Sequence, residues 1–326
     1  MRLLFPRHLS IETSDACNRS CTWCPVQRDA LKGPPRLLDW QLYLRLLDEL
    51  RDAPRPLKVT LQWIDEPLMN PRLLDYADEG RRRAPDVTWL LQTNGDLLTP
   101  QSWSALGERF DAIAVNLYSA SAHRRLSRLG IAPPPAARRP HQSPGRVARE
   151  GTRGAAIFNE KYHDVDWVQR RDEVLAPSTR RCARPWTQAT VGFDGAVHVC
   201  CRDNLKQHPV GSLQTTSLFE AYNGERAQAL RWLLSRGHRR AIAMCSTCPV
   251  SFGGDPRHLT RTQQAKLAQH ARAANEPNTR PTLNQARATQ LAAPDMSHAR
   301  DDSPERLAQL RAVSHAVVGR KTAISP

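Results

Sequence analysis

Short β-rich runs alternate with amphipathic helical segments through the first 120 residues, and this alternation restricts the fold more than any other feature of the chain. The β-rich runs are 7–16, 57–64, 86–93 and 111–120. The helical segments between them are 37–50, 70–83 and 99–110. Strands separated by helices of this length predict an α/β fold, in which parallel strands with right-handed crossovers form a complete or partial (βα) barrel.

The second half of the chain follows a different pattern. Prolines and arginines exclude regular structure from 132–150, which is predicted to be a long loop. One more strand is expected within 154–168 and a helix over 217–237. Between them, 190–201 predicts a hairpin with Asp194-Gly195 at its turn. The C-terminal part is therefore expected to be a small domain made of a β-hairpin and a helix.

These patterns predict three regions along the chain. The barrel core is expected at 1–170 and the hairpin and helix domain at 171–260. Beyond about residue 260 the sequence has no Phe, Trp or Tyr and is dominated by Ala, Gln, Arg, Asn and Pro. Because such a composition buries little apolar surface, 261–326 is predicted to be a disordered or loosely helical tail.

The composition of the chain limits which binding partners and which cellular compartment are expected. The 326 residues carry 47 Lys and Arg against 32 Asp and Glu, and the formal net charge of +15 favours anionic partners or substrates. The basic pairs are scattered along the chain, so a nucleic-acid partner is not expected. The sequence contains no signal peptide and no run of 18 apolar residues, which predicts a cytoplasmic protein without a membrane partner.

The eight cysteines fall into an early group and a late group. In a reducing compartment such groups are metal ligands or reactive thiols more often than disulfides. Cys17, Cys21 and Cys24 form a C-x3-C-x2-C loop directly after the first β-rich run. Three thiolates from one loop can hold three irons of a [4Fe–4S] cube and leave the fourth iron open, whereas a closed zinc site needs four protein ligands. The loop therefore predicts an iron–sulfur cluster, with a partial zinc site as the alternative.

With Trp23 before its last cysteine, the loop resembles the C-x3-C-x-aromatic-C signature of the radical S-adenosylmethionine (SAM) superfamily. The resemblance implies that SAM binds the open iron and is cleaved to a 5′-deoxyadenosyl radical, which abstracts hydrogen from a substrate. It implies that Glu66 binds the SAM ammonium, with Asp65 in place of the usual glycine. Asn94 and Asn116 stand where the family contacts SAM. The alternatives are a solvated acid for Glu66 and a turn former for Asn116.

The late cysteines resemble the SPASM/twitch extension of radical SAM enzymes. In the shorter twitch form, the resemblance implies that one auxiliary [4Fe–4S] cluster is closed by four cysteines, here Cys182, Cys200, Cys245 and Cys248. Cys201 is then surplus, either as an idle thiol or as the ligand in place of Cys200. A four-thiolate zinc site is the alternative for the whole group.

The spacing of the late cysteines is also similar to that in the deoxy-scyllo-inosamine dehydrogenases of aminoglycoside biosynthesis, over residues 5 to about 255. This likeness implies a radical SAM oxidoreductase that oxidises an alcohol of a sugar or aminocyclitol, with the auxiliary cluster accepting an electron. Asn159-Glu160-Lys161-Tyr162 stands where those enzymes have Asn-Arg-Gly-Gly. Glu160 or Lys161 is the candidate catalytic base, and a solvated charged pair is the alternative.

Two further function classes stay open. One is a maturase that modifies a ribosomally made peptide, and the other is an RNA-modifying or nucleic-acid-binding protein. The expected partners are a small-molecule or peptide substrate and an electron donor of the flavodoxin or ferredoxin type. A precursor-peptide gene alongside would favour the maturase, and a salt-sensitive shift with RNA would favour the nucleic-acid function.

Anaerobic reconstitution is expected to give about eight irons per chain, because two [4Fe–4S] clusters are predicted. Replacing Cys17, Cys21 and Cys24 together by Ala is expected to remove about half of this iron and to abolish SAM cleavage. Iron assays and quantification of 5′-deoxyadenosine check both outcomes. Unchanged iron in the triple variant, or stoichiometric zinc in the unaltered protein, would contradict the cluster.

Overall fold

A computed structural model describes residues 4–21, 24, 34–132, 155–160, 182–246 and 248. The strands are β1 (His8–Ile11), β2 (Lys58–Leu61), β3 (Thr88–Thr93), β4 (Ala112–Leu117), β5 (Ala155–Glu160), β6 (Gln188–Val191), β7 (Ala196–His198) and β8 (Gly211–Ser212). The α-helices are α1 (Trp40–Arg51), α2 (Leu73–Arg83), α3 (Pro100–Arg109), α4 (Ala120–Arg128), α7 (Leu218–Asn223), α8 (Glu225–Ser235) and α9 (Ala243–Ser246). Short 3-10 helices are η2 (Pro67–Met69), η4 (Arg184–Trp186) and η5 (Arg239–Ala241).

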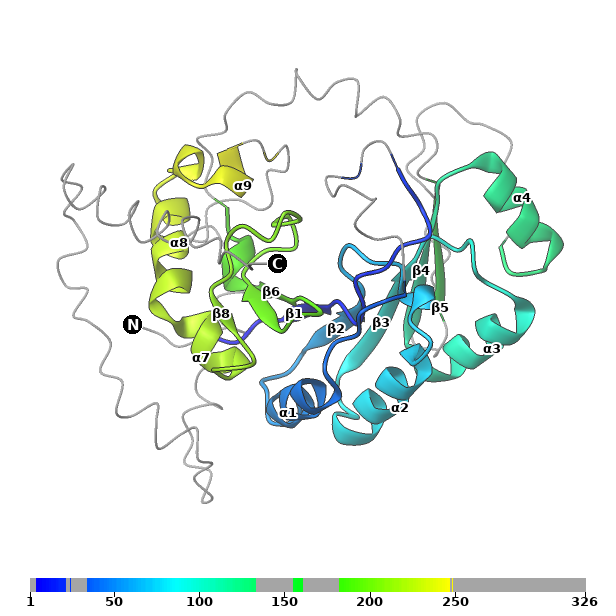
Figure 1. Ribbon diagram of the computed structural model, residues 1–326, viewed down its shortest axis with the longest axis horizontal. Coiled ribbons are helices and arrows are strands. Elements are labelled where there is room, and N and C mark those ends of the chain that lie inside the picture. The colour runs from blue at the N-terminus through cyan, green and yellow to red at the C-terminus, as the bar shows by residue number, and fades with distance from the viewer. Residues whose placement is uncertain are drawn as a thin grey trace, which may run out of the picture.

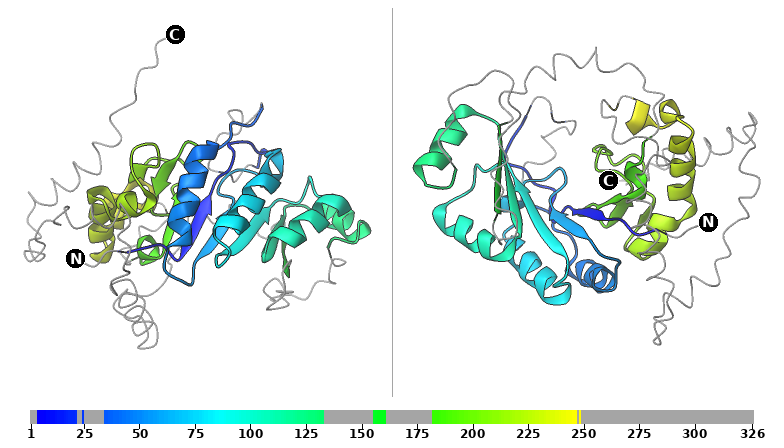
Figure 2. Two further views of the ribbon diagram at one scale, coloured as in Figure 1. Left: turned by 90° about the horizontal axis from the view of Figure 1, so that it is seen from below. Right: turned by 180° about the vertical axis from the view of Figure 1, so that it is seen from behind.

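The strands form one eight-stranded sheet in the order β5-β4-β3-β2-β1-β6-β7-β8. Strands β1 to β5 are parallel to their neighbours, which confirms the predicted α/β fold with parallel strands. The sheet is curved, with α1 to α4 along its outer side (Figure 1, and from below and behind in Figure 2). Because the crossover helices α1 to α4 lie on that side, the opposite face of β1 to β5 is left for a site.

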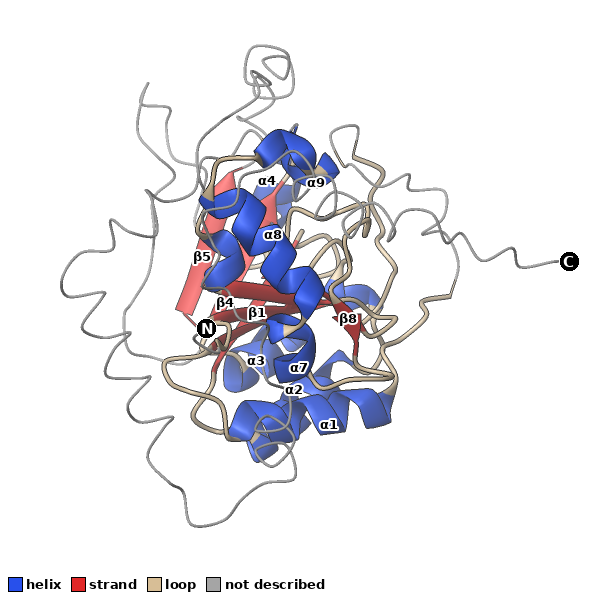
Figure 3. Cartoon of the chain, turned by 90° about the vertical axis from the view of Figure 1, so that its left-hand side faces the viewer, coloured by secondary structure: helices blue, strands red, loops and turns tan. Residues whose placement is uncertain are grey.

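The C-terminal hairpin continues the same sheet. Strand β6 pairs in parallel with β1, and β7 and β8 follow as antiparallel strands. Figure 3 looks onto the side where α7 and α8 lie in front of the strands. The sequence predicted a hairpin here, and its pairing with the first strand was not predicted. The domain boundaries at 170 and 260 stay predictions, because 161–181 and 249–326 lie outside the described residues, as does 133–150 of the predicted loop.

Alternating side chains give the strands two different faces. On β1, Leu9 and Ile11 are fully buried in the hydrophobic core, while His8 and Ser10 face the other way into a cavity. The same alternation places Val59 and Leu61 of β2 in the core. Period-2 alternation therefore separates an apolar outer face, covered by helices, from a polar inner face.

The core beneath the helices contains a cluster of aromatic rings. Tyr43 of α1 and Tyr76 of α2 lie edge to face with ring centroids 4.8 Å apart, and the Tyr43 hydroxyl donates to the Tyr76 carbonyl at 2.7 Å. Trp89 of β3 is fully buried beside Gly80 of α2. Helices α1 and α2 can approach the sheet this closely because position 80 carries no side chain.

The helix predicted over 217–237 is wrong as a single element, because it is divided into α7 and α8 at Gly224. The ψ angle of Gly224 is 168°, which is extended backbone. Ser217 and Glu220 form a capping box at the start of α7, and Glu225 begins a new first turn. Helix α4 was not predicted, although Ser119 caps it through the Ala122 amide. Within the described residues, no helix is long and apolar enough to span a bilayer.

Replacing Gly80 by Ala is expected to lower the free energy of unfolding by about 1–3 kcal/mol, because overpacking a dense core strains it. The added Cβ would lie 2.6 Å from Trp89 Cη2 and 2.9 Å from the Tyr43 hydroxyl. Gly107 of α3 is the matched control, since a Cβ there meets nothing within 4 Å. Gly107→Ala should raise the free energy of unfolding by up to about 1 kcal/mol. Urea denaturation measures both, and equal stability of the two variants would contradict the packing argument.

Candidate active site

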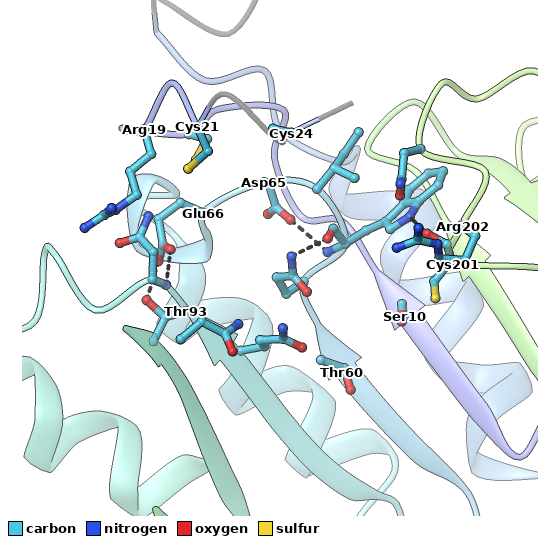
Figure 4. Close-up of a pocket in the computed structure, with 18 of the residues that line it drawn as sticks. Ser10, Arg19, Cys21, Cys24, Thr60, Asp65, Glu66, Thr93, Cys201 and Arg202 are labelled. Atoms are coloured by element: carbon cyan, nitrogen blue, oxygen red, sulfur yellow. Dashed lines mark hydrogen bonds between the residues drawn. The ribbon is translucent and has the colours of Figure 1, made fainter. Parts of the chain in front are cut away.

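A cavity of about 550 Å³ lies on the inner face of the sheet (Figure 4). Its floor consists of neutral polar side chains from the strands and the residues just after them, namely Ser10, Thr60, Gln62, Gln92, Asn116 and Gln188. His8 joins them, and its Nε2 lies 2.8 Å from Thr60 Oγ1. The polar side chains of this floor offer hydrogen bonds rather than apolar contacts, so the cavity suits a polar ligand.

The predicted cluster cysteines, Cys17, Cys21 and Cys24, all line this cavity. They belong to the loop 17–24 that follows β1, within which the Cys24 amide donates to the Cys21 carbonyl at 3.0 Å. Their three thiols enter one wall of a single cavity, and this donor set fits a cluster with one iron left open to a ligand from the cavity. Trp23 lies outside the described residues.

A two-point clamp from the turn after β3 holds this cysteine loop. Arg19 Nε and Nη2 donate to the two carboxylate oxygens of Asp96 at 2.5 and 2.6 Å. The Asn94 side-chain amide donates to Asn18 Oδ1 at 2.7 Å. Bidentate pairing fixes orientation as well as distance, so the Asp96 carboxylate sets how the loop faces the cavity. Asn94, predicted to contact SAM, lines the cavity and uses its amide for this clamp.

Glu66 is only 2 % exposed and lies between the loops after three strands. Its amide donates to the Ala16 carbonyl at 2.8 Å, and its carboxylate accepts from Thr93 Oγ1 at 2.6 Å and from the Asn94 amide at 2.7 Å. Burial raises the pKa of Glu66 to about 7 in spite of these hydrogen bonds. The solvated-acid alternative for Glu66 is wrong, since the carboxylate is buried in the wall that carries the cysteines.

Asp65 is also buried, and its Oδ1 accepts from the Trp63 amide at 2.9 Å. Burial, followed by the nearby Glu12 carboxylate, raises the pKa of Asp65 well above its usual range. In Figure 4 Asp65 lies between Glu66 and the opposite wall. Its position next to the cavity places a second acidic side chain beside Glu66.

The structure describes Asn116 in full and the candidate base, Glu160 or Lys161, only in part. Asn116 is 4 % exposed and lines the cavity. Its Oδ1 accepts from the side-chain amide of Asn159 at 3.1 Å, which links β4 to β5. Glu160 follows Asn159 and pairs in register with Leu117. The Glu160 side chain and the whole of Lys161 lie outside what the structure describes. Their catalytic role therefore stays a prediction.

A second, smaller cavity gathers the late cysteines. Its lining contains all four predicted auxiliary ligands, Cys182, Cys200, Cys245 and Cys248. Burial raises the pKa of Cys245 to about 12, with the neighbouring Cys182 and Cys248 thiols adding to the shift, so metal binding there has to displace a proton. Cys201 lines the first cavity instead. This division favours Cys200 over Cys201 as the auxiliary ligand.

Among the described residues that line the second cavity there is no carboxylate or imidazole. Four thiols and no oxygen or nitrogen donor are a set that suits an iron–sulfur cluster. Within the described part of the chain, no three His, Cys, Asp or Glu side chains are close enough to share a single metal ion.

Sequence reasoning missed the residues that complete the first cavity from the C-terminal region. Arg184, Cys201 and Arg202 line it, and Arg184 Nη1 donates to the Cys201 sulfur at 2.8 Å. Figure 4 shows Cys201 and Arg202 across the cavity from Arg19 and Cys21. Their position follows from the pairing of β6 with β1, for which the sequence carries no local signal.

Two family descriptions match the chain. Residues 11–134 match the Radical SAM superfamily, and residues 182–249 match SPASM, an iron–sulfur cluster-binding domain. The first range includes the cysteine loop and Glu66, and the second begins at Cys182 and contains Cys248. The first matched region therefore contains the cysteine wall of the large cavity, and the second contains the four cysteines of the smaller cavity.

Known proteins with the same architecture extend this match. The S-adenosyl-L-methionine-dependent 2-deoxy-scyllo-inosamine dehydrogenase of Niallia circulans is 21% identical over 249 residues, which cover 74% of this chain and 91% of that protein. The crystal structure of BtrN in complex with AdoMet and 2-DOIA has a TM-score of 0.60 and 18% identity over 78% of this chain and 96% of that one. BtrN with selenomethionine in an open conformation has a TM-score of 0.56 and 17% identity, over 77% and 95%. At these identities the structural likeness establishes the fold.

Replacing Glu66 by Gln is expected to flatten the pH dependence of stability in the iron-free protein. Because the pKa of Glu66 is raised from 4.5 to about 7 on folding, the folded state binds the extra proton. Its contribution to stability is complete below pH 4.5 and is lost as pH rises to about 7, by at most about 3 kcal/mol. Urea denaturation from about pH 5 to about pH 8 measures this slope.

Glu79 is the control for that measurement. Hydrogen bonds from Arg82 and Arg83 lower the pKa of Glu79 to about 2, so its titration ends below the range tested. Glu79→Gln should therefore keep the pH dependence of the unaltered protein. An unchanged slope in Glu66→Gln would show that its carboxyl ionises normally.

Proposed function

The chain belongs to the radical SAM superfamily, and from that premise we propose that it oxidises an alcohol of a small hydroxylated molecule, such as a sugar or aminocyclitol. It is a radical SAM enzyme with SAM and [4Fe–4S] clusters as cofactors. The proposal goes further than this class, since it names the reaction and the use of the second cluster. It is supported by the dehydrogenase among the relatives, which acts on 2-deoxy-scyllo-inosamine according to its name.

One observation carries the proposal, namely that the large cavity lies between the two groups of cysteines. Cys17, Cys21 and Cys24 form part of one wall. Arg184 and Arg202 of the C-terminal region line this cavity and also the cavity of the late cysteines. A substrate in the large cavity would thus be adjacent to both cluster sites, as an oxidation that removes hydrogen and then one electron requires.

The residues present fit both cofactors. We propose that Cys17, Cys21 and Cys24 hold the first cluster, that Cys182, Cys200, Cys245 and Cys248 hold the second, and that Glu66 faces the SAM ammonium. When bound, SAM and its cluster would supply the radical that removes hydrogen from the carbinol carbon. Hydrogen bonds to Glu66 and from Asn159 hold Thr93 and Asn116 in place beside the proposed SAM position.

The hydroxyl proton of the substrate also needs an acceptor. We propose Glu160 or Lys161 for this role, because β5 ends at Glu160, one residue after the Asn159 side chain that donates to Asn116. The electron that starts the reaction is proposed to come from a flavodoxin or ferredoxin. A cavity of about 550 Å³ is of the size that holds a small molecule, which supports this reading over a peptide maturase.

The test separates the roles of the two clusters. Cys245→Ala with Cys248→Ala is expected to keep SAM cleavage and to lose at least about nine-tenths of oxidised product, because the substrate radical would lack its electron acceptor. Mass spectrometry of 5′-deoxyadenosine and product in one anaerobic assay measures both. Cys201→Ser is the matched control, and it should keep the full iron content.

Metal binding often stabilises a fold, so circular dichroism on the same samples checks that the double variant is folded. A folded double variant that still forms oxidised product at the unaltered rate would show that the second electron leaves by another route. The auxiliary cluster would then not be the acceptor.

A further inference from the structure

The charges around the large cavity are unevenly distributed between its two walls. Among the described residues that line it, the acidic ones are Asp65 and Glu66, both next to the cysteine loop. The opposite wall carries Arg202 beside Cys201, and Arg184 joins them through its hydrogen bond to the Cys201 sulfur. The cavity therefore has a positively charged end, on the side away from the proposed SAM position.

Neighbouring residues donate hydrogen bonds to both oxygens of Glu66 and to one oxygen of Asp65. The donors to Glu66 are Thr93, Asn94 and Leu68, and the donor to Asp65 is the Trp63 amide. A substrate ammonium would need a carboxylate to pair with it at the positive end, and the described lining offers none there.

The acids nearest to the arginine wall are paired with other groups. Asp203, next in sequence to Arg202, is 1 % exposed and accepts from His198 at 2.7 Å and from two backbone amides. Glu12 accepts from Lys206 Nζ at 2.6 Å. Within the described residues, neither carboxylate accepts a hydrogen bond from the Arg202 guanidinium.

The two arginines differ in what they already contact. Arg184 donates to Gln188 Oε1 at 2.9 Å and to the Cys201 sulfur at 2.8 Å. Within the described residues the Arg202 guanidinium makes no side-chain hydrogen bond and no ion pair, while its backbone amide donates to the Cys200 sulfur at 3.4 Å. Arg19, the other arginine of the cavity, is already paired with Asp96. The Arg202 guanidinium therefore has donors to offer a ligand.

We propose that the substrate of this site carries an anionic group, a phosphate or a carboxylate, which Arg202 binds with help from Arg184, while the neutral polar floor binds its hydroxyl groups. This inference rests on the proposed function and narrows it from sugars and aminocyclitols in general to acidic hydroxylated molecules. Guanidinium groups bind phosphate and carboxylate through two parallel hydrogen bonds, and the net charge of +15 adds attraction at longer range.

The experiment measures binding rather than turnover. Calorimetry on the SAM-bound holoenzyme uses glucose 6-phosphate, glucuronate, glucose and glucosamine as probes. At least one of the two anionic probes is expected to bind about tenfold or more tightly than both glucose and glucosamine, as a charge-assisted hydrogen bond requires. Equal or tighter binding of glucose or glucosamine, or no binding by any probe, would overturn the proposal.

Variants assign the preference to Arg202. Arg202→Gln is expected to bring the anionic and neutral probes within about threefold of each other, and Arg202→Lys to keep part of the preference, because ammonium lacks the planar fork. Arg128→Gln, on the exposed last turn of α4, is the matched control for net charge and should change nothing. A preference that survives in Arg202→Gln would mean that this charge serves the auxiliary cluster instead.

Failure of the inference can be told from failure of the proposed function. Iron content and 5′-deoxyadenosine formation are measured on the same preparations. An anion preference in a protein that never forms an oxidised product would contradict the proposed reaction alone. Oxidation of a cationic or neutral substrate, without any anion preference in binding, would contradict the inference alone.

Discussion

The carboxylate of Glu66 is the point on which the cysteine wall of the site depends. Glu66 joins two loops. Its backbone amide donates to the Ala16 carbonyl after β1, and its carboxylate accepts from Thr93 and Asn94 at the end of β3. These loops in turn contain Asn18 and Arg19 on one side and Asp96 on the other, which form the clamp. Parallel strands bring their carboxyl ends to one edge, but only such cross-links fix the loops relative to one another.

Burying this carboxylate has an energetic cost that explains its chemistry. A pKa raised from 4.5 to about 7 means that keeping the charge costs about 3 kcal/mol, even with three donors around it. A cation placed beside it would reverse that shift and recover the energy on binding. The wall is therefore organised in advance for a positively charged group such as the proposed SAM ammonium, whereas the arginine wall is organised for the opposite charge.

The parts predicted from the sequence are those with local signals. Strands β1 to β4 and helices α1 to α3 follow from hydrophobic periodicity, and the positions of Glu66 and Asn116 follow from the resemblance to the radical SAM family. The pairing of β6 with β1 joins residues about 180 positions apart, for which no local pattern exists. Arg184 and Arg202 enter the cavity only through that pairing, so the sequence could show their charge but not their place. The break at Gly224 was missed because apolar periodicity continues across it.

The same pairing explains how one cavity can serve two metal sites. Because β6 extends the sheet beyond β1, the segment after β7 reaches the large cavity, and neighbouring residues of that segment line different cavities. Cys200 lines the cavity of the late cysteines and Cys201 lines the large one, with Arg184 and Arg202 lining both. The path between the proposed substrate and the auxiliary cluster thus passes Arg184 and Arg202, which line both cavities. The arginines along that path bring positive charge to both sides of it, where an anionic substrate and a thiolate-bound cluster would otherwise repel each other.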